Sequence, residues 1–364
     1  MALRSRDRVE KYIYQTLASL NSGERLPSLR TIMANCEVSQ LTVQNVLKDY
    51  EEQGAIESSD RRGFFKVEAA QVYHFEQLDL IYCPHALHMD PALQFHGSFS
   101  HYLGRYCGET WRSVRMHFME GEANPDVIKR IAESSKCHAC VIVAPPSPEI
   151  GNAFREYHVP YVNLFSNSPQ LDPNAPNIII DNDAVVDVQM KHLLDLGHRK
   201  IAHLHMIRPT EVIRDLCMRR ESFYKYAMAH SLRINPAWVQ FGGYDSEEAM
   251  TAMNTILDLD DLPTAAIVDD LHLPAVFKSL EQHGYTPGED FSVVGTNNQG
   301  ISKAVYPTAT SVDMCQQAAA QQAMEALEKV IVDRSYRETI FIQPELICRN
   351  STNQYGAHRD EKAS

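Results

Sequence analysis

Residues 23–67 decide the fold of the amino-terminal part of the chain, with the sequence GERLPSLRTIMANCEVSQLTVQNVLKDYEEQGAIESSDRRGFFKV. Ser28 and Ser39 each precede a run with helical apolar spacing, and serine is favoured at the position just before a helix. Gly54 ends the second run, whose apolar residues are Val43, Val46, Leu47 and Tyr50. Two short extended runs follow, joined by a polar turn. Helix, turn, helix and hairpin outline a winged helix-turn-helix, which lays its second helix in the DNA major groove.

This stretch resembles the heads of GntR-type transcription factors over nearly all of residues 1–68. The resemblance rests on Leu26-Pro27-Ser28-x-Arg30, Val38-Ser39-x-x-Thr42-Val43, Leu47, Gly54-x-Ile56 and Gly63-x-Phe65-x-Val67. It implies that the residues facing DNA are Arg30, Ser39, Gln40, Thr42 and Gln44, with Arg62 and Gly63 in the wing. The family usually has arginine where this chain has Gln40 and Gln44. Because arginine commonly recognises guanine and glutamine adenine, we expect an operator different from the usual family site.

Charge is distributed unevenly between the head and the rest of the chain. Residues 1–70 carry 10 Lys+Arg and 10 Asp+Glu, so the whole net charge of −13 comes from the remainder. An acidic body disfavours DNA binding through a large non-specific surface, since phosphate contacts supply most non-specific affinity. We therefore expect a homodimer, in which two heads compensate for the weak affinity of one.

Composition and length limit the classes to which the protein can belong. At 364 residues the chain can hold the head and a large two-lobed body. No run of 18 apolar residues occurs, so we expect no transmembrane helix and no membrane partner. Met1-Ala2-Leu3-Arg4 leads directly into a polar helix without an apolar signal core, so we expect the protein to stay in the cytoplasm.

The sequence does not indicate a metal or another cofactor. Its eight cysteines are spread along the chain, as expected for reduced cytosolic thiols. Cys137-His138-Ala139-Cys140 is a lone CxxC beside an expected strand, and buried thiols explain it better than a metal or redox site. The sixteen histidines form no HExxH or comparable ligand set.

From Leu78 onward, short apolar runs alternate with amphipathic stretches. The expected strands are Leu78–Cys83, Ser113–Phe118, Cys140–Ala144, Tyr161–Leu164, Ile178–Ile180, Lys200–His205, Ala265–Val268 and Phe291–Gly295. The expected helices are Pro125–Ser134, Ala184–Leu196, Arg219–His230, Ser246–Leu257, Pro274–His283 and Asp313–Val332. This alternation predicts an α/β body of two lobes with doubly wound parallel sheets and a ligand cleft at the carboxyl ends of the strands. We place the head at 1–70, the body at 71–354 and a polar tail at 355–364.

The body resembles the effector-binding domain of LacI-type regulators, which shares the fold of periplasmic sugar-binding proteins. The stretches that match are His192-Leu193-Leu194-x-Leu196-Gly197-His198-Arg199-x-Ile201-Ala202, Arg219-x-x-Ser222-Phe223, Pro263-Thr264-Ala265, Gly284-x-x-Pro287-Gly288-x-Asp290-x-Ser292-Val293-Val294-Gly295 and Leu346-x-x-Arg349-x-Ser351-Thr352. The match is strong over 158–352 and weak over 71–135. A GntR-type head on a LacI-type body is similar to the arabinose-repressor subgroup of the GntR family.

The resemblance implies an effector site built mainly in the second lobe. Arg219 falls where these proteins place an arginine that donates hydrogen bonds to sugar hydroxyls. Asp269 and Asn297 follow two strands and are expected opposite Arg219, although the family usually has Asn at the first position and Asp at the second. Tyr82 and His85 are candidates for the other wall of the cleft.

The sequence favours a DNA-binding transcriptional regulator, a repressor by family tendency, controlled by a small molecule of the sugar class. Two alternatives stay open. Because the first lobe matches weakly, the cleft could instead respond to a protein partner. An enzyme fused to a DNA-binding head is the third possibility, but the body lacks a phosphate loop, a nucleophile elbow and paired catalytic carboxylates. The identity of the effector, the operator sequence and the sign of the response do not follow from the sequence.

Overall fold

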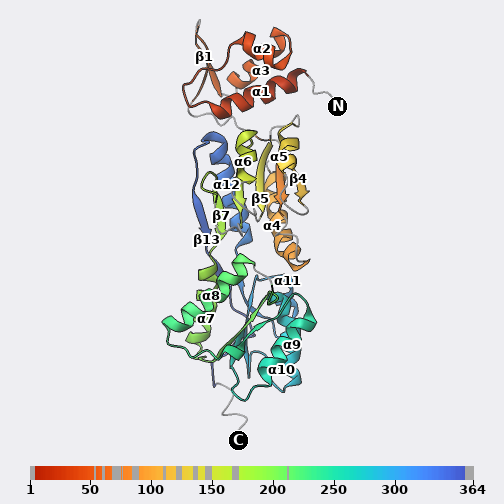
Figure 1. Cartoon of the computed structure of the whole chain (residues 1–364), viewed down its shortest axis with the longest axis vertical. Coiled ribbons are helices and arrows are strands. Elements are labelled where there is room, and N and C mark those ends of the chain that lie inside the picture. Colours follow the sequence, from red (N-terminus) through yellow and green to blue (C-terminus); the bar gives the residue numbers. More distant parts are fainter. Residues whose placement is uncertain are drawn as a thin grey trace. The chain divides into compact units, whose positions relative to one another are not determined.

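The chain is seen here in a computed structural model (Figure 1). The residues that it describes are 5–52, 55–59, 62–67, 75, 77–83, 90–109, 112–119, 125–133, 138–143, 150–165, 172–210 and 213–356. They form two compact units. The first comprises Met1–His88, Ser100–Ile178 and Ala320–Ile340, and the second comprises Met89–Phe99, Ile179–Ala319 and Phe341–Ser364.

The head has the expected winged helix-turn-helix arrangement. Its elements are α1 (Ser5–Ser19), α2 (Leu29–Cys36), α3 (Gln40–Glu52), β1 (Ile56–Ser59) and β2 (Gly63–Lys66). Both predicted caps are confirmed, because Thr31 N donates to Ser28 Oγ at 3.2 Å and Thr42 N to Ser39 Oγ at 3.4 Å. The three helices bury a shared core of Val9, Ile13, Leu17, Ile32, Cys36, Val43, Val46 and Leu47. Gly54, expected to end α3, lies outside the described residues.

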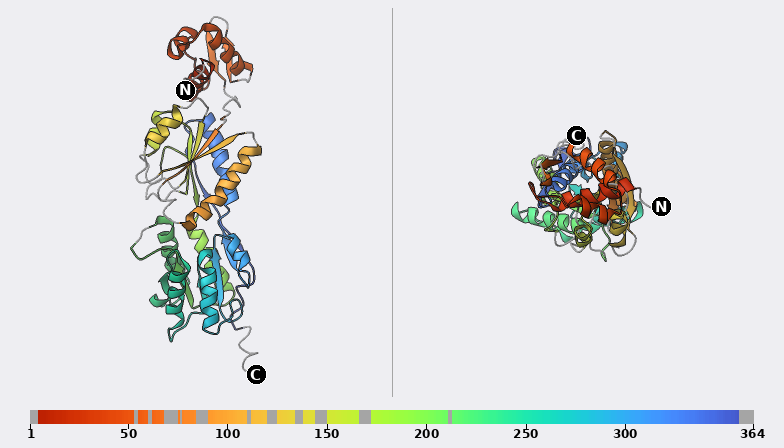
Figure 2. Two further views of the ribbon diagram at one scale, coloured as in Figure 1. Left: turned by 90° about the vertical axis from the view of Figure 1, so that its right-hand side faces the viewer. Right: turned by 90° about the horizontal axis from the view of Figure 1, so that it is seen from above.

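The first lobe contains a six-stranded sheet in the order β13-β7-β6-β5-β3-β4. Its strands are β3 (Gln77–Tyr82), β4 (Ser113–Phe118), β5 (His138–Val143), β6 (Tyr161–Leu164), β7 (Asn177–Ile180) and β13 (Thr339–Ile342). The pairs from β4 to β7 are parallel. Helices lie on both faces of this sheet (Figure 2), and they are α4 (Asp90–Glu109), α5 (Pro125–Ala132), α6 (Ile150–Glu156) and α12 (Gln316–Val332). The face covered by α5 and α6 buries Ile81, Ile128, Ile142 and Phe154.

The second lobe repeats this plan with a sheet in the order β14-β12-β11-β10-β8-β9. The strands are β8 (Ile201–His205), β9 (Val239–Phe241), β10 (Ala265–Ile267), β11 (Ser292–Thr296), β12 (Thr310–Asp313) and β14 (Glu345–Ile347). Only the β12–β14 pair of this sheet is antiparallel. The longer helices are α7 (Asn182–Asp195), α8 (Arg214–Ala229), α9 (Ser246–Leu257) and α10 (Leu273–Gln282), with shorter turns at Pro236–Trp238, Asp270–His272 and α11 (Gly300–Ala304).

Successive strand residues of the second lobe face opposite helix layers. Ala265 and Val294 pack with α7 and α8, whereas Ala266 and Val293 pack with α9 and α10. Because strand side chains alternate between the two faces, a sheet covered on both sides needs apolar residues at nearly every position. This confirms the doubly wound parallel architecture predicted from the alternation of strands and helices.

The segment 349–355 closes the second lobe by hydrogen bonds to other elements. Ser351 O accepts from Val293 N at 2.7 Å, and Ser351 Oγ accepts from Thr310 N at 2.8 Å. His198 Nε2 lies 3.1 Å from Asn353 O. Gly197 follows the end of α7, as expected for a helix predicted to end at Leu196. Its φ is +90°, and α7 closes with bonds from Gly197 N to Leu194 O and from His198 N to Leu193 O.

Two expected helices begin three or more residues away from their predicted starts. The helix expected at Asp313–Val332 begins at Gln316, because Asp313 ends β12 and its Oδ1 accepts from Cys315 N at 2.7 Å. The helix expected to start at Arg219 begins five residues earlier, at Arg214. Its cap is Ile213, which makes no side-chain hydrogen bond, so the usual polar start signal is missing. The short strands β9, β12, β13 and β14 were not predicted.

The described residues contain no helix whose length and apolar character would allow it to cross a membrane.

Two glycines with the same backbone angle allow a matched stability test. Gly284 has φ +80° with open space where a Cβ would stand, whereas Gly288 has φ +81° and its Cβ would lie 2.0 Å from Asn350 O. Gly284→Ala should lower the free energy of unfolding by about 1–2 kcal/mol, the left-handed backbone cost alone. Gly288→Ala should cost more, because Asn350 must move and its neighbour Ser351 is hydrogen-bonded to Val293. Denaturant unfolding of both variants measures this difference. Equal losses of unfolding free energy would show that the 349–355 segment can move at no energetic cost.

Candidate functional site

The head presents the predicted DNA-facing residues on its surface. Arg30, Ser39, Gln40 and Gln44 are exposed, and Thr42 is half-buried. Arg30, Ser39 and Thr42 also line one shallow hollow between α2 and the start of α3. Ser39, Gln40, Thr42 and Gln44 therefore lie at or near the amino-terminal end of α3, with Arg30 at the start of α2. The amino-terminal end is the part of a recognition helix that contacts base edges.

Two further observations concern α3. Ser39 Oγ lies 2.9 Å from Thr42 Oγ1 as well as capping the helix, so both hydroxyls already help to fix the start of α3. Leu41 was not singled out in the sequence, yet its side chain is 67% exposed between Gln40 and Thr42. An exposed apolar side chain beside the residues predicted to face DNA is of the kind that contacts a thymine methyl group. Leu41 does not follow the helical spacing of the apolar residues that α3 buries, and this departure could have identified it from the sequence.

The wing is a two-stranded antiparallel hairpin in which Ser59 pairs with Gly63. Gly63 has φ +101°, and a Cβ there would lie 3.1 Å from Arg25 Nε. This position therefore favours glycine for both its backbone conformation and its packing. Arg62 is exposed at the turn, while Arg61 lies outside the described residues.

A polar cluster occupies the carboxyl ends of the central strands of the second lobe. Asp269 follows β10 and Asn297 follows β11, and Asn297 Nδ2 donates to Asp269 Oδ2 at 2.7 Å. Asp269 Oδ1 also accepts from Leu271 N at 3.0 Å. The parallel pairing of β10 with β11 brings the two predicted residues together, because equivalent strand ends meet at one edge of the sheet.

Arg219 belongs to the same cluster but lies in the second turn of α8, not just after a loop as expected. It is half-buried, and its Nε donates to Asn182 Oδ1 at 2.8 Å. Asn182 Nδ2 in turn donates to Asp215 Oδ1 at 3.0 Å. Burial lowers the pKa of Arg219, while the carboxylates of Asp215 and Asp269 oppose that shift. Asn182 and Asp215, which orient this arginine, were missed in the sequence.

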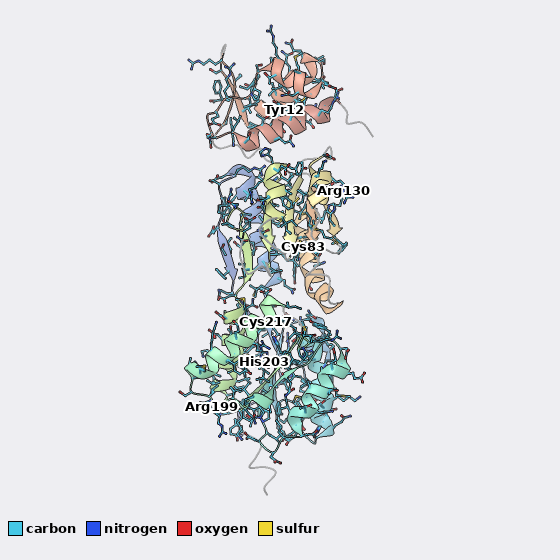
Figure 3. The ribbon with its side chains drawn as sticks, viewed as in Figure 1. Tyr12, Cys83, Arg130, Arg199, His203 and Cys217 are labelled. Carbon is cyan, nitrogen blue, oxygen red and sulfur yellow. The ribbon has the colours of Figure 1, made fainter. Side chains whose placement is uncertain are left out.

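Three buried histidines adjoin the cluster. His203 (Figure 3) and His205 lie on β8 with ring centroids 5.6 Å apart, and burial lowers the pKa of each to about 3. Burial also lowers the pKa of His272, whose Nε2 lies 3.0 Å from Gly243 O. Within the described part of the chain, no hydrogen-bond partner is found for three of their ring nitrogens, His203 Nδ1, His205 Nε2 and His272 Nδ1. These imidazoles are therefore neutral near pH 7 and keep unused hydrogen-bonding capacity.

Asp270 lies next to the cluster, but both of its carboxylate oxygens accept hydrogen bonds from other parts of the second lobe. Ser311 Oγ donates to its Oδ1 at 2.7 Å, and Gln299 N donates to its Oδ2 at 2.8 Å. Burial, together with the neighbouring Asp269, raises the pKa of Asp270 to about 7. The side chain is fully buried and ties β12 and α11 to the end of β10.

Two site residues were predicted in the first lobe, and the structure describes only Tyr82. Tyr82 is buried, its hydroxyl bonds to Ser100, and its ring stacks on Phe118 with centroids 5.3 Å apart. His85 lies outside the described residues, so its role stays a prediction. Cys140 of the CxxC is buried in β5 and burial raises its pKa, while Cys137 is outside the described part. No group of three or more possible metal-ligating side chains occurs in the described part.

Comparison with known families assigns the two parts of the chain separately. Residues 5–65 match the family of bacterial regulatory proteins named gntR, and residues 190–352 match a periplasmic binding protein-like domain. The HTH-type transcriptional repressor PurR of Mannheimia succiniciproducens is 29% identical over 167 residues, which are 45% of this chain and 49% of that protein. The chain thus spans about half the length of the curated relatives it matches.

Solved structures share the fold at low sequence identity. The transcriptional regulator CelR in complex with cellobiose is 17% identical, covers 94% of this chain and 99% of its own, and has a TM-score of 0.62. The lac repressor dimer bound to operator and the anti-inducer ONPF is 16% identical, covers 77% and 95%, and has a TM-score of 0.62. The chain therefore combines a winged helix-turn-helix head that matches the bacterial gntR family with a two-lobed body that matches a periplasmic binding protein-like domain and shares the fold of these solved structures.

Proposed function

We propose that this protein is a sequence-specific transcriptional repressor that binds operator DNA in the cytoplasm and is controlled by a small-molecule effector. The observation that carries the proposal is the exposed surface of α3, where Gln40, Leu41 and Gln44 surround a capped helix start. The similarity of the body to the repressor PurR and to a periplasmic binding protein-like domain supports the proposal that an effector controls the protein. The working boundaries remain 1–70 for the head and 71–354 for the effector-binding body.

We assign the effector site to the second-lobe cluster and the effector to the sugar class. Arg219 offers charged donors, Asp269 offers acceptors, and Asn297 offers both. His205 adds a neutral imidazole. A mixed set of donors and acceptors suits hydroxyl groups, each of which both donates and accepts. Tyr82 and His85 remain candidates for contacts from the first lobe.

We propose that the active form is a homodimer. β4 stands at one end of the first-lobe sheet order and exposes two large apolar side chains, Met116 (46%) and Phe118 (55%). An apolar edge strand is a surface that a second copy can cover. In such a dimer, an effector that prefers one arrangement of the lobes changes operator affinity by linkage, without contacting DNA.

The first functional prediction concerns base recognition. Gln44→Ala should reduce discrimination at one A·T pair of the operator by about 1–3 kcal/mol, because a bidentate amide contact is lost. Leu41→Ala should weaken the preference for thymine at a neighbouring position, with little change in affinity for random DNA. Binding to operator variants and to random DNA at fixed salt measures both effects.

The control for this prediction is Gln282→Ala, which removes an exposed glutamine from α10 of the second lobe. It should leave the ratio of specific to non-specific affinity unchanged. If Gln44→Ala behaves like this control, α3 does not use Gln44 for recognition.

The second functional prediction concerns the effector. A screen of neutral sugars by thermal shift should identify a ligand that raises the melting temperature. Arg219→Ala should weaken binding of that ligand about tenfold or more, because hydrogen bonds from a charged donor are lost. Operator binding by the ligand-free variant should stay intact.

Arg233→Ala is the matched control, since Arg233 is an exposed arginine of the same lobe. The melting temperatures of both ligand-free variants separate lost contacts from lost stability. A folded Arg219→Ala protein with unchanged sugar affinity would remove Arg219 from the site.

The third functional prediction follows from the neutral histidines. Because the folded pKa values of His203 and His205 lie near 3, below the unfolded value, the unfolded chain binds their protons first as the pH falls below 6.5. Stability should therefore fall between pH 6.5 and 5, by about 2 kcal/mol for each histidine. Asp270 acts in the opposite direction, since its folded pKa near 7 is raised and protonation favours the folded state there.

Denaturant unfolding at pH 7 and at pH 5 measures this dependence. His205→Asn should make the loss of stability on acidification smaller, whereas His230→Asn, at an exposed position, should leave it unchanged. An identical pH dependence in His205→Asn and the unchanged protein would mean that folding does not lower the pKa of His205.

A further inference from the structure

The turn that follows β11 has a strained backbone. Asn297 has φ +96° and Asn298 has φ +46°, so two successive residues other than glycine adopt left-handed conformations. Each conformation costs free energy, because the Cβ crowds the following carbonyl oxygen, although asparagine tolerates this better than most residues. Such strain persists only where surrounding contacts impose it, and it is concentrated at functional sites. The 297–299 turn must therefore be held by contacts from elsewhere in the second lobe.

Backbone groups of the turn bond to β12. Asn297 N donates to Val312 O at 2.8 Å, and Asn298 N donates to Ser311 Oγ at 3.0 Å. These two bonds join the turn to the neighbouring strand. They leave the side chains of both asparagines free to make further contacts, and those contacts fix the rest of the turn.

The side-chain amide of Asn298 has a defined orientation. Its Oδ1 accepts from Arg349 Nη2 at 2.5 Å, and its Nδ2 donates to Asp313 Oδ2 at 2.8 Å. A guanidinium group can only donate and a carboxylate can only accept, so an amide turned the other way round would lose both bonds. The Asn298 side chain is therefore held from both ends.

Arg349 also reaches the turn by a second route. Its Nη1 donates to Ala309 O at 2.6 Å and to Ser302 Oγ at 3.4 Å. Ser302 Oγ in turn donates to Gln299 O at 2.6 Å. One planar guanidinium group thus joins the residue before β12, helix α11 and the Asn298 side chain. The rigid fork of arginine suits an arrangement of several acceptors in fixed positions.

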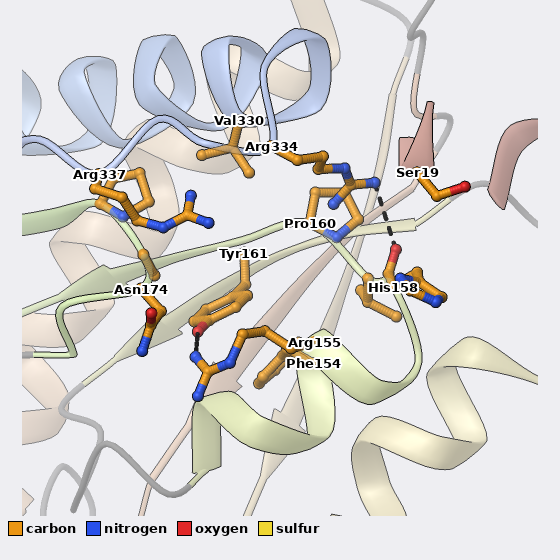
Figure 4. Close-up of a pocket in the computed structure, with 13 residues that line it drawn as sticks. Ser19, Phe154, Arg155, His158, Pro160, Tyr161, Asn174, Val330, Arg334 and Arg337 are labelled. Atoms are coloured by element: carbon orange, nitrogen blue, oxygen red, sulfur yellow. Dashed lines mark hydrogen bonds between the residues drawn. The ribbon is translucent and has the colours of Figure 1, made fainter. Parts of the chain in front are cut away.

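Arg155 of the first lobe is fixed in a different way. Its Nη1 donates to Tyr161 Oη at 2.9 Å (Figure 4) and forms an ion pair with the buried Asp172 at 3.2 Å. Arg349 forms no ion pair with another described residue, and the oxygens that it binds belong to carbonyl, amide and hydroxyl groups. The effect of Arg349 on the turn therefore depends on hydrogen-bond geometry more than on charge.

We propose that Arg349 is a positioning residue, which holds the 297–299 turn and thereby sets the direction of Asn297 at the effector site. Asn297 Nδ2 is bound to Asp269 Oδ2 at 2.7 Å, and Asn297 Oδ1 accepts no hydrogen bond from another described residue. This oxygen is therefore open to a hydroxyl group of the ligand. Arg349 acts through Asn298 and does not itself contact the ligand. The proposal rests on the effector site proposed above.

Hydrogen exchange of the ligand-free full chain tests whether Arg349 holds the turn. In Arg349→Gln, peptides that contain residues 297–299 should exchange about tenfold faster, because the bonds that restrain the turn are lost. Arg349→Lys should behave in the same way, since an ammonium group keeps the charge but lacks the fork that reaches three oxygens. Unchanged exchange in Arg349→Gln, or full rescue by Arg349→Lys, would overturn the proposal.

Arg199→Gln is the matched control for hydrogen exchange. Arg199 also donates to uncharged oxygens of the second lobe, Leu194 O at 3.0 Å and His198 O at 2.9 Å, but it lies before the start of β8. This variant should leave exchange of the 297–299 turn unchanged. Faster exchange of the turn in Arg199→Gln as well would show a general loosening of the lobe and would overturn a specific role for Arg349.

Affinity for sugars tests the link to the effector site. The unchanged protein is titrated with D-glucose, D-ribose and cellobiose, and whichever of them binds is used for the variants. Arg349→Gln and Asn298→Gly should each weaken its binding about tenfold. The double variant should also lose about tenfold, and not about a hundredfold, because both changes break the same contact. Glycine adopts positive φ freely, so Asn298→Gly keeps the backbone of the turn and removes only the side chain.

Melting temperatures of the ligand-free variants separate lost positioning from lost stability. Additive losses of affinity in the double variant, or unchanged affinity in folded Arg349→Gln, would overturn the positioning role while leaving the effector site in place. Binding of none of the three sugars by the unchanged protein would count against the proposed sugar class. Hydrogen exchange would then still decide whether Arg349 holds the turn.

Discussion

The parallel ladder of β8, β10 and β11 is the constraint on which the second lobe depends. Its register sets Ile201 beside Ala265 and Ala265 beside Ser292, so the three strands end at one edge of the sheet. Side chains within the ladder are enclosed by helices on both faces and are mostly apolar. Polar chemistry is therefore concentrated at the strand ends, where backbone and side chains can satisfy one another. The Asp269–Asn297 contact follows from that arrangement.

The sequence was most informative where local physics and tertiary packing agree. Ser28 and Ser39 cap their helices as expected, and the apolar spacing of α3 is the spacing of the residues it buries. It was less informative where tertiary contacts replace local signals. α8 begins at a position without a polar cap, and β12 gains its strand character by pairing with β11 and β14. Such pairings join residues that are distant in sequence, so no local pattern reports them.

The candidate site shows the same division. Arg219, Asp269 and Asn297 were found by resemblance, and the structure places the last two in contact. The groups that orient Arg219 were not found, because Asn182 and Asp215 look like ordinary polar residues at helix starts. His203 and His205 alternate within β8, and only their occurrence in an otherwise apolar run could have drawn attention to them. Their chemical state depends on burial, which only the folded chain provides.

The closing segment 349–355 bears on how the chain folds during synthesis. Val293 N and Thr310 N donate to Ser351, so these two backbone groups of β11 and β12 lack their partners until that residue has been synthesised. The core of the head, by contrast, draws on residues from Val9 to Ile56. Because domains fold as units in the order of synthesis, the head can form while the ribosome is still translating the body. The second lobe can complete these hydrogen bonds only after Ser351 has been translated, and until then β11 and β12 keep unpaired backbone groups that another chain can bind.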